Sequence, residues 1–255
     1  MRVALLSDIH GNLIALNAVL ADLASRGPFD EVVVAGDLVW AGPWPAEVVD
    51  RVCSMESVVI QGNTDAFFRL RPNETPPGKR ESRFAEQMEW TLEQLGPQRA
   101  AYLAGLPASH LIRPAGGHEL LVVHANPYDL DRPILPQASG VELDELLSSD
   151  GIEPTWSALA FGHVHTPFQR KWRGRLLIDV ASAGLPMDGD PRAAYAILTW
   201  DEAGWRGEHY RVRYDVPVVA RRMTTGGMPR GKHFAQRLMG ANYGGVPARE
   251  MLGAE

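Results

Sequence analysis

Short apolar runs alternate with segments of helical periodicity over the first sixty residues of the chain. The runs at 2–7, 31–37 and 57–63 are almost wholly apolar, which is typical of strands buried on both faces of a parallel sheet. Leucines recur at helical spacing within residues 12–27, and residues 45–54 begin with a proline in the first turn of a predicted helix. This β-α-β-α-β order predicts a parallel sheet with right-handed crossovers.

The pattern changes beyond the third run. Residues 66–107 contain two helical patterns, and we expect them to form a helical excursion above the sheet. From residue 108, strand-like runs joined by Gly-Gly and Arg-Gly turn signals predict antiparallel hairpins. After Asp215 a short basic helix is predicted, followed by glycine-rich breaks with little periodicity. Two packed sheets with helices outside account for these segments.

Composition narrows the class of protein. A chain of 255 residues, 45% of them hydrophobic, fits one large α/β domain or such a domain with a small appendage. The formal net charge of −6 argues against general nucleic-acid binding. The single cysteine, Cys53, excludes an internal disulfide framework and a thiolate metal cluster, and it favours a reducing compartment. The apolar run after Met1 is too short for a signal peptide or a membrane span, so we expect a soluble, cytoplasmic protein with no membrane partner.

Polar side chains that can bind metals stand where several apolar runs end. Ligands of open α/β sheets bind just beyond the carboxyl ends of the strands, so we expect these side chains to meet at one location. Each feature alone has an ordinary explanation, such as a helix cap or a satisfied core histidine, but together they indicate a site. The run ends are Asp8-Ile9-His10, Gly36-Asp37, Gly62-Asn63, His124 and Gly162-His163-Val164-His165.

Two carboxylates, four imidazoles and one amide oxygen suit a hydrolytic centre with two metal ions. Such ligands favour Mn, Fe, Co, Ni or Zn over Cu(I) or an iron–sulfur cluster. One carboxylate must bridge ions about 3.5–4 Å apart, and Asp37, at the end of the central predicted strand, is our candidate. Two divalent ions and two aspartates leave two positive charges, which attract a phosphoryl group and lower the pKa of bound water to about 7.

The motif series resembles that of the calcineurin-like metallophosphoesterases in order and rough spacing. The resemblance extends from residue 1 to about 213 and is greatest to the small prokaryotic, phosphodiesterase-like branch. It implies a four-layer α/β/β/α sandwich over residues 1–213, including the excursion at 66–107. Residues 214–255 would then form an extension of unassigned role. The matching motifs are Asp8-x-His10, Gly36-Asp37, Gly62-Asn63-x-Asp65, His124 and Gly162-His163-x-His165.

The resemblance also implies a division of the ligands between two divalent ions, with manganese the expected metal. A hydroxide that bridges the ions would attack phosphorus in line, so the expected substrate is a small phosphate ester. One ion would be held by Asp8, His10, Asp37 and His165, and the other by Asp37, Asn63, His124 and His163.

Two positions depart from the family pattern. Phosphatases of this family usually have a histidine that assists the leaving oxygen where this chain has Thr64. A threonine does not titrate near neutral pH, and a general acid typically contributes about 10²–10⁴-fold. We therefore expect a phosphodiesterase that prefers good leaving groups. Within residues 177–184, where relatives often have Asn-Pro-Gly-Ser, Asp179, Val180 and Ala181 replace the first three and Ser182 remains, and we assign no site residue there. The candidate catalytic residues are Asp37, Asn63, Thr64 and Asp65, the last orienting a ligand.

Three alternatives stay open from the sequence: a phosphomonoesterase, a dinucleoside polyphosphate hydrolase and a non-catalytic scaffold of the same fold. Thr64 argues against the two hydrolases, and the complete ligand set argues against the scaffold. A Rossmann oxidoreductase is excluded because no Gly-x-Gly-x-x-Gly follows the first strand. We interpret Trp40 and Trp44 as packing residues rather than base-stacking ones. No pattern specifies an oligomeric state.

Overall fold

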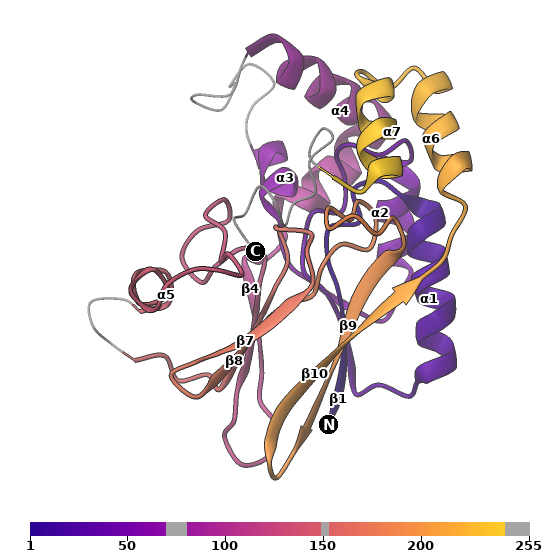
Figure 1. Cartoon of the computed structure of the whole chain (residues 1–255). Helices are drawn as coiled ribbons and strands as arrows, with labels where there is room; N and C mark the ends of the chain where they lie inside the picture. Colours follow the sequence, from indigo (N-terminus) through magenta and orange to yellow (C-terminus); the bar gives the residue numbers. More distant parts are fainter. Residues whose placement is uncertain (70–80, 149–152, 243–255) are drawn as a thin grey trace.

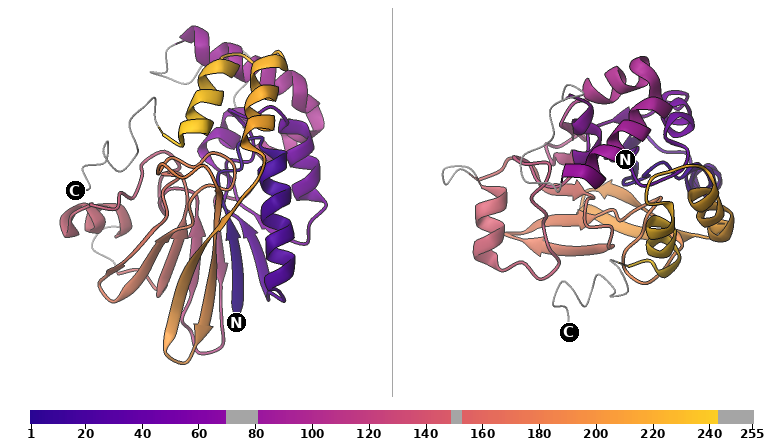
Figure 2. Two further views of the ribbon diagram at one scale, coloured as in Figure 1. Left: turned by 45° about the vertical axis from the view of Figure 1, so that its right-hand side comes forward. Right: turned by 90° about the horizontal axis from the view of Figure 1, so that it is seen from above.

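Two five-stranded sheets packed face to face form the centre of the computed structural model, which describes residues 1–69, 81–148 and 153–242 (Figure 1). The strand order is β10-β9-β1-β2-β3 in the first sheet and β4-β5-β6-β8-β7 in the second. Helices surround the two sheets, as the additional views in Figure 2 show. The expected sandwich of two mixed sheets flanked by helices is therefore confirmed.

The first sheet contains the predicted β-α-β-α-β opening. Strands β1, β2 and β3 are parallel, and β2 lies between the other two. The third strand is only two residues long, shorter than predicted, and the β9–β10 hairpin pairs antiparallel with β1. The elements are β1 (Arg2–Leu6), α1 (Leu13–Arg26), β2 (Glu31–Val34), α2 (Pro45–Cys53), β3 (Val58–Val59), β9 (Ala193–Asp201) and β10 (Gly204–Val212).

The second sheet is mixed, which corrects the expectation of antiparallel hairpins throughout this half. Strands β5, β6 and β8 are parallel, and only the edge strands β4 and β7 are antiparallel to their neighbours. The β5–β6 connection contains a helix that was not predicted, and such a crossover makes a parallel pair possible. The elements are β4 (Ser109–Ile112), β5 (Leu120–Val123), α5 (Gly140–Leu147), β6 (Ala158–Phe161), β7 (Phe168–Trp172) and β8 (Arg175–Asp179).

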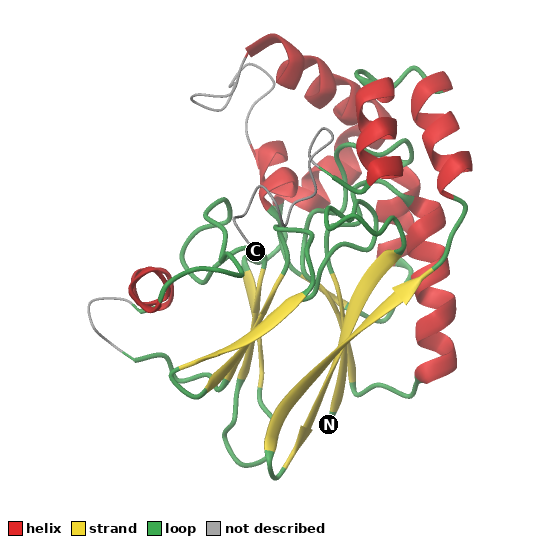
Figure 3. Cartoon of the chain, in the orientation of Figure 1, coloured by secondary structure: helices red, strands yellow, loops and turns green. Residues whose placement is uncertain are grey.

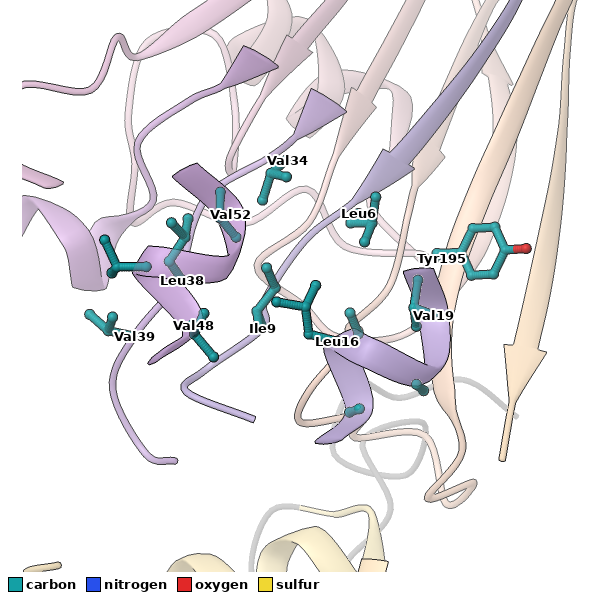
Figure 4. Close-up of a cluster of buried hydrophobic side chains, with 14 of the residues drawn as sticks. Leu6, Ile9, Leu16, Val19, Val34, Leu38, Val39, Val48, Val52 and Tyr195 are labelled. Atoms are coloured by element: carbon teal, nitrogen blue, oxygen red, sulfur yellow. The ribbon is translucent and has the colours of Figure 1, made fainter. Parts of the chain in front are cut away.

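Side chains alternate between the two faces of each sheet, so one apolar core lies between the sheets and one lies on the outer face of each sheet, beneath helices. These three cores separate four layers, which are helices, sheet, sheet and helices. In β1, Val3 and Leu5 face the second sheet, whereas Leu6 packs under the helices on the outer face. In β6, Ala160 faces the first sheet and Phe161 packs in the core that α5 covers. Burial on both faces explains why these strands read as continuous apolar runs. Figure 4 shows part of the core beneath α1 and α2.

The predicted helical excursion is only partly described. It contains α3 (Asn63–Ala66), the 3₁₀ turn η1 (Phe67–Arg69) and α4 (Glu81–Ala104), while residues 70–80 lie outside the described part. Gly96 has non-helical dihedral angles (φ 67°, ψ 170°) and divides α4 into two helical pieces before Pro97. The two predicted helical patterns are thus confirmed, and α4 lies at the end of the molecule opposite to the N-terminus (Figure 1).

The C-terminal segment contains two helices rather than one short basic helix. They are α6 (Val216–Thr225) and α7 (Gly231–Gly240), and α7 was missed because its few apolar positions lie between glycines. Both helices share a buried cluster with Ala41, Leu185 and Met187. Figure 3 shows them standing above the loops that follow the strands. No helix in the described ranges is long and apolar enough to cross a membrane.

Candidate metal centre

The seven predicted metal ligands come together where strands of both sheets end. The first sheet contributes the segments after β1, β2 and β3, and the second contributes those after β5 and β6. Each ligand has an atom within 3.6 Å of another member of the set. The members are Asp8, His10, Asp37, Asn63, His124, His163 and His165.

The backbone is strained at five of these seven residues. Asp8, His10, Asp37, His163 and His165 have φ angles between 48° and 71°, a region that non-glycine residues seldom adopt. Such conformations persist only where the surrounding structure enforces them, and they concentrate at functional sites. The strain therefore marks this location independently of the chemistry of its side chains.

Glycines precede several ligands because neighbouring strand ends approach one another very closely. A Cβ atom on Gly162 would lie 2.1 Å from Ser7 Oγ and 2.4 Å from Asp8 Oδ2. A Cβ atom on Gly36 would lie 2.4 Å from the backbone nitrogen of Gly62. The Gly-Asp and Gly-His pairs of the sequence thus reflect packing between strand ends.

Asp8, His10 and His165 form one group of ligand atoms. His10 Nδ1 lies 3.2 Å from the carbonyl oxygen of Val39, and His165 Nδ1 lies 2.6 Å from that of Leu185. A carbonyl oxygen can only accept, so each Nδ1 carries the hydrogen and each Nε2 keeps a lone pair. The two Nε2 atoms are 3.1 Å apart, and His165 Nε2 is 3.1 Å from Asp8 Oδ1. Three acceptor atoms therefore face one another with no hydrogen between them.

Asn63, His124 and His163 form a second group with the same property. His124 Nδ1 donates to the carbonyl oxygen of Ala35 at 2.9 Å, and His163 Nε2 donates to that of Asp131 at 3.1 Å. The remaining ring nitrogens, His124 Nε2 and His163 Nδ1, lie 3.3 Å apart. The amide oxygen of Asn63 is 3.1 Å from His124 Nε2. With both imidazoles in the neutral, metal-binding form, the atoms that face one another are again all acceptors.

Asp37 lies between the two groups. Its Oδ2 is 3.6 Å from His10 Nε2, and its Oδ1 is 3.5 Å from His124 Nε2. The backbone N–H of Thr64 donates to Oδ1 at 2.9 Å and holds the carboxylate in this orientation. One oxygen therefore faces each group, which is the position expected of a bridging carboxylate.

The protonation states also suit cation binding. Burial, together with the neighbouring His165, lowers the pKa of His10 to about 4, so this imidazole is neutral at neutral pH. Burial alone would raise the pKa of Asp8, but His165 and the other nearby imidazoles hold it well below its usual range. Asp8 Oδ1 is buried and accepts no hydrogen bond from any described residue. Charged carboxylates and neutral imidazoles are the forms that bind divalent metals. His124 differs, because burial alone would lower its pKa but the carboxylates of Asp37 and Asp8 raise it, so a cation at this position would compete with a proton.

These observations fit two divalent cations at the site. Mutually facing lone pairs and an unpaired buried carboxylate oxygen are unfavourable unless a positive charge lies between them. Asp37 faces both groups of acceptor atoms. Asp8 also lies near both groups, because its carboxylate is within 4.8 Å of the ligand atoms of Asp37 and His124 as well as those of His10 and His165.

Thr64 and Asp65 support the site rather than face into it. The Thr64 hydroxyl donates to the carbonyl oxygen of Val39 at 3.2 Å, the same oxygen that orients His10. The Asp65 carboxylate accepts from the backbone nitrogens of Leu38 and Gly62, both at 3.0 Å, and so joins the loops after β2 and β3. Burial and the charge of Asp37 raise the pKa of Asp65 to about 7. A catalytic role for either residue stays a prediction.

Two contributors were missed from the sequence. Asp131 contacts both Asn63 and His163, yet no spacing in its loop signals a site. Ser182 lies in the segment to which we assigned no site residue, but its hydroxyl donates to the backbone oxygen of Asp8 at 2.7 Å and accepts from the Leu185 nitrogen at 2.7 Å. The Ser182 hydroxyl thereby holds the Leu185 carbonyl near His165. The available signal in the sequence was that Ser182 matches the family pattern although its neighbours do not.

Comparison with known proteins finds matches that cover most of the chain. The family model of the calcineurin-like phosphoesterases matches residues 1–180. An uncharacterised protein from Methanocaldococcus jannaschii is 27% identical over 245 residues, which cover 89% of this chain and 93% of that protein. The crystal structure of a metallophosphoesterase from Sphaerobacter thermophilus is 28% identical with a TM-score of 0.74, covering 94% of this chain and 100% of that one. A hypothetical protein from Pyrococcus horikoshii OT3 shares the fold, with 22% identity, a TM-score of 0.79 and coverage of 96% and 98%.

Proposed function

Because the chain belongs to the calcineurin-like phosphoesterase family, we propose that it is a phosphodiesterase with a centre of two divalent metal ions. The observation that carries this proposal is the arrangement of ring nitrogens around Asp37. Four imidazoles, each fixed by a backbone carbonyl, present lone pairs in two groups, and one carboxylate oxygen faces each group.

Each group of side chains would hold one ion. Asp8, His10 and His165 would bind the first, Asn63, His124 and His163 the second, and Asp37 both. When bound, the ions would neutralise charge on the phosphoryl group and supply an activated water molecule. Two aspartates leave such a centre with two positive charges, so an acidic chain can attract an anionic ester at one point.

The surroundings of Thr64 support a preference for good leaving groups. The Thr64 hydroxyl is committed to the Val39 carbonyl and has no titrating group to offer a leaving oxygen. The neighbouring Asp65 is fully buried, and both of its oxygens accept backbone hydrogen bonds, so it is not placed to donate a proton there either. Esters whose leaving oxygen needs no proton, such as aryl diesters, are therefore the favoured substrates.

A substrate screen with the metal-loaded protein tests this proposal. The protein would be loaded with Mn²⁺, and in parallel with Fe, Zn, Ni or Co, and assayed on a bis-aryl phosphate diester, an alkyl monoester, a cyclic nucleotide and a dinucleoside polyphosphate. We expect the highest kcat/KM for the bis-aryl diester. A higher value for the monoester or for the dinucleoside polyphosphate would instead support the corresponding alternative.

The variant Asp37→Asn is the matched control for this screen. It keeps the size of the side chain but removes the charge that would bridge the two ions, so both hydrolysis and metal content should fall. Elemental analysis would give the metal content as ions per chain. Unchanged metal content would contradict the bridging role of Asp37, and no hydrolysis of any ester by the loaded wild-type protein would favour a non-catalytic scaffold.

A further inference from the structure

Asp131, which is not itself a predicted ligand, contacts two of the predicted ligands through two different groups. Its carboxylate Oδ1 accepts a hydrogen bond from Asn63 Nδ2 at 3.0 Å, and its backbone oxygen accepts one from His163 Nε2 at 3.1 Å. It lies in the loop between β5 and α5, far along the chain from either partner. The contact is therefore a product of the tertiary structure.

The carboxylate of Asp131 determines which way the Asn63 amide points. The two ends of an amide are similar in size, so packing alone distinguishes them poorly, and hydrogen bonds decide the orientation. An ionised carboxylate only accepts, so it selects the NH₂ end of Asn63. The amide oxygen must then face His124 Nε2, 3.1 Å away, where it is available to a cation.

The loop that carries Asp131 is held by its own polar contacts. Asn126 is buried, and its side chain accepts from the backbone nitrogens of Tyr128 and Asp129, both at 2.9 Å, and donates to the Arg132 oxygen at 2.6 Å. Asp129 accepts from the Asp131 nitrogen at 2.7 Å. These bonds place the Asp131 backbone oxygen where it fixes the His163 tautomer.

The other group of ligands has no contact of this kind among the described residues. His10 and His165 are oriented by the carbonyls of Val39 and Leu185, and both of those residues are buried. Asp131 in contrast is exposed. A change of the Asp131 side chain can therefore act on one group of ligands and leave the other intact.

We propose that Asp131 is a positioning residue that holds Asn63 in its metal-binding orientation and thereby sets the affinity of one cation position, that of Asn63, His124 and His163. The inference rests on the metal centre of the proposed function. Loss of a partner that orients a ligand typically lowers metal affinity by about 10- to 100-fold. The position of Asp8, His10 and His165 should keep its affinity.

Calorimetric titration of Mn²⁺ into the metal-free protein tests this proposal. Asp131→Ala should weaken one of two binding events by about 10- to 100-fold and leave the other unchanged. Asp131→Asn should restore part of the affinity, because its amide oxygen can accept from Asn63 Nδ2 although its NH₂ group no longer excludes the opposite orientation. Glu145→Ala is the matched control, since it removes a nearby exposed acid that pairs with Arg132 and not with a ligand.

Three results would overturn the proposal. The first is that Asp131→Ala binds Mn²⁺ at both positions with wild-type affinity, and the second is that it weakens both positions equally. The third is that Asp131→Asn binds Mn²⁺ as weakly as Asp131→Ala does, which would assign the effect to the charge of Asp131. The titration contains no substrate. A protein that binds two ions but hydrolyses no ester would therefore contradict the proposed function and leave this inference standing.

Discussion

Backbone carbonyl oxygens decide which ring nitrogen each histidine of the site presents. In three of the histidines Nδ1 donates to a backbone carbonyl and Nε2 is left to face the site. The pairs are His10 with Val39, His124 with Ala35, and His165 with Leu185. His163 is the exception, since its Nε2 donates and its Nδ1 is free. A partner that fixes the tautomer also raises the basicity of the free nitrogen, so these carbonyls should contribute to metal affinity without touching a metal.

The close approach between the ends of β1 and β6 gives a prediction about Gly162. Gly162→Ala should lower the free energy of unfolding by about 1–3 kcal/mol, because the new methyl group would overlap Ser7 Oγ and Asp8 Oδ2. The displaced Asp8 carboxylate should also weaken metal binding. Urea denaturation of the metal-free protein measures the first effect and metal titration the second.

Gly140→Ala is the matched control for that substitution. Gly140 is the first residue of α5, and a Cβ atom there would meet nothing within 4 Å. Its stability should stay at or slightly above that of the wild type, since alanine favours helix over glycine. Equal stability of Gly162→Ala and Gly140→Ala would contradict the packing explanation for the glycine.

At the scale of elements, the α6–α7 pair supports the site from outside the residues matched by the family model. Its buried cluster includes Ala41 and Leu185, which lie in the loops whose carbonyls orient His10 and His165. The backbone nitrogen of Gly189 donates to the Ala241 oxygen at 2.9 Å and links the second loop to the end of α7. We therefore expect these helices to help position His10 and His165, although neither residue belongs to them.

Leu238→Ala tests this support. Leu238 is fully buried in the cluster, so its truncation should cost about 2–5 kcal/mol of unfolding free energy. The metal affinity of the Asp8, His10 and His165 position should fall. Asp131→Ala should instead weaken the other cation position. Denaturation and Mn²⁺ titration measure the two effects.

Met239→Ala on the same helix is the control, because the Met239 side chain is 53% exposed. It should change stability by less than about 0.5 kcal/mol and leave both metal affinities at their wild-type values. A Leu238→Ala protein with unaltered metal binding would show that α6 and α7 stabilise the fold without positioning the ligands.

At the scale of the whole molecule, ligand atoms from both sheets face one another across the end of the sandwich. The Nε2 atoms of His10 and His165 are 3.1 Å apart, and Asn63 Oδ1 is 3.1 Å from His124 Nε2, so each close pair joins the two sheets. A cation bound between such atoms should stabilise the packing of one sheet against the other. Metal binding and folding should therefore be coupled, because the unfolded chain has no such arrangement.

Removal of metal should lower the melting temperature. At a Mn²⁺ concentration of 100 times Kd, each site should contribute about 2.7 kcal/mol. One kcal/mol corresponds to a shift of about 2–4 °C in a domain of roughly this size. Differential scanning calorimetry with Mn²⁺ and with a chelator would measure the shift. Ca²⁺ is the control of equal charge, and it should stabilise less because it prefers oxygen ligands to imidazole. An equal shift with both ions would indicate nonspecific charge screening.

Much of the fold, and the convergence of seven polar side chains at one location, could be predicted from the sequence. The runs ending in Asp8, Asp37 and Asn63 became three parallel strands in the expected order, because burial on both faces leaves a local apolar pattern. The helix α5 and the parallel β5–β6 pair could not be predicted, since the choice of a strand's partner depends on contacts distant in the chain.

By itself the sequence determined the seven side chains that stand at strand ends and meet at the site, because strand ends and ligand types are local properties, but it did not reveal Asp131 or Ser182. Only the tertiary structure decided how those side chains are used. The Thr64 hydroxyl is turned toward Val39, the Asn63 amide is oriented by Asp131, and each histidine tautomer is set by a carbonyl. Every residue supplies a backbone carbonyl regardless of its identity, so its partner can be known only from the folded arrangement.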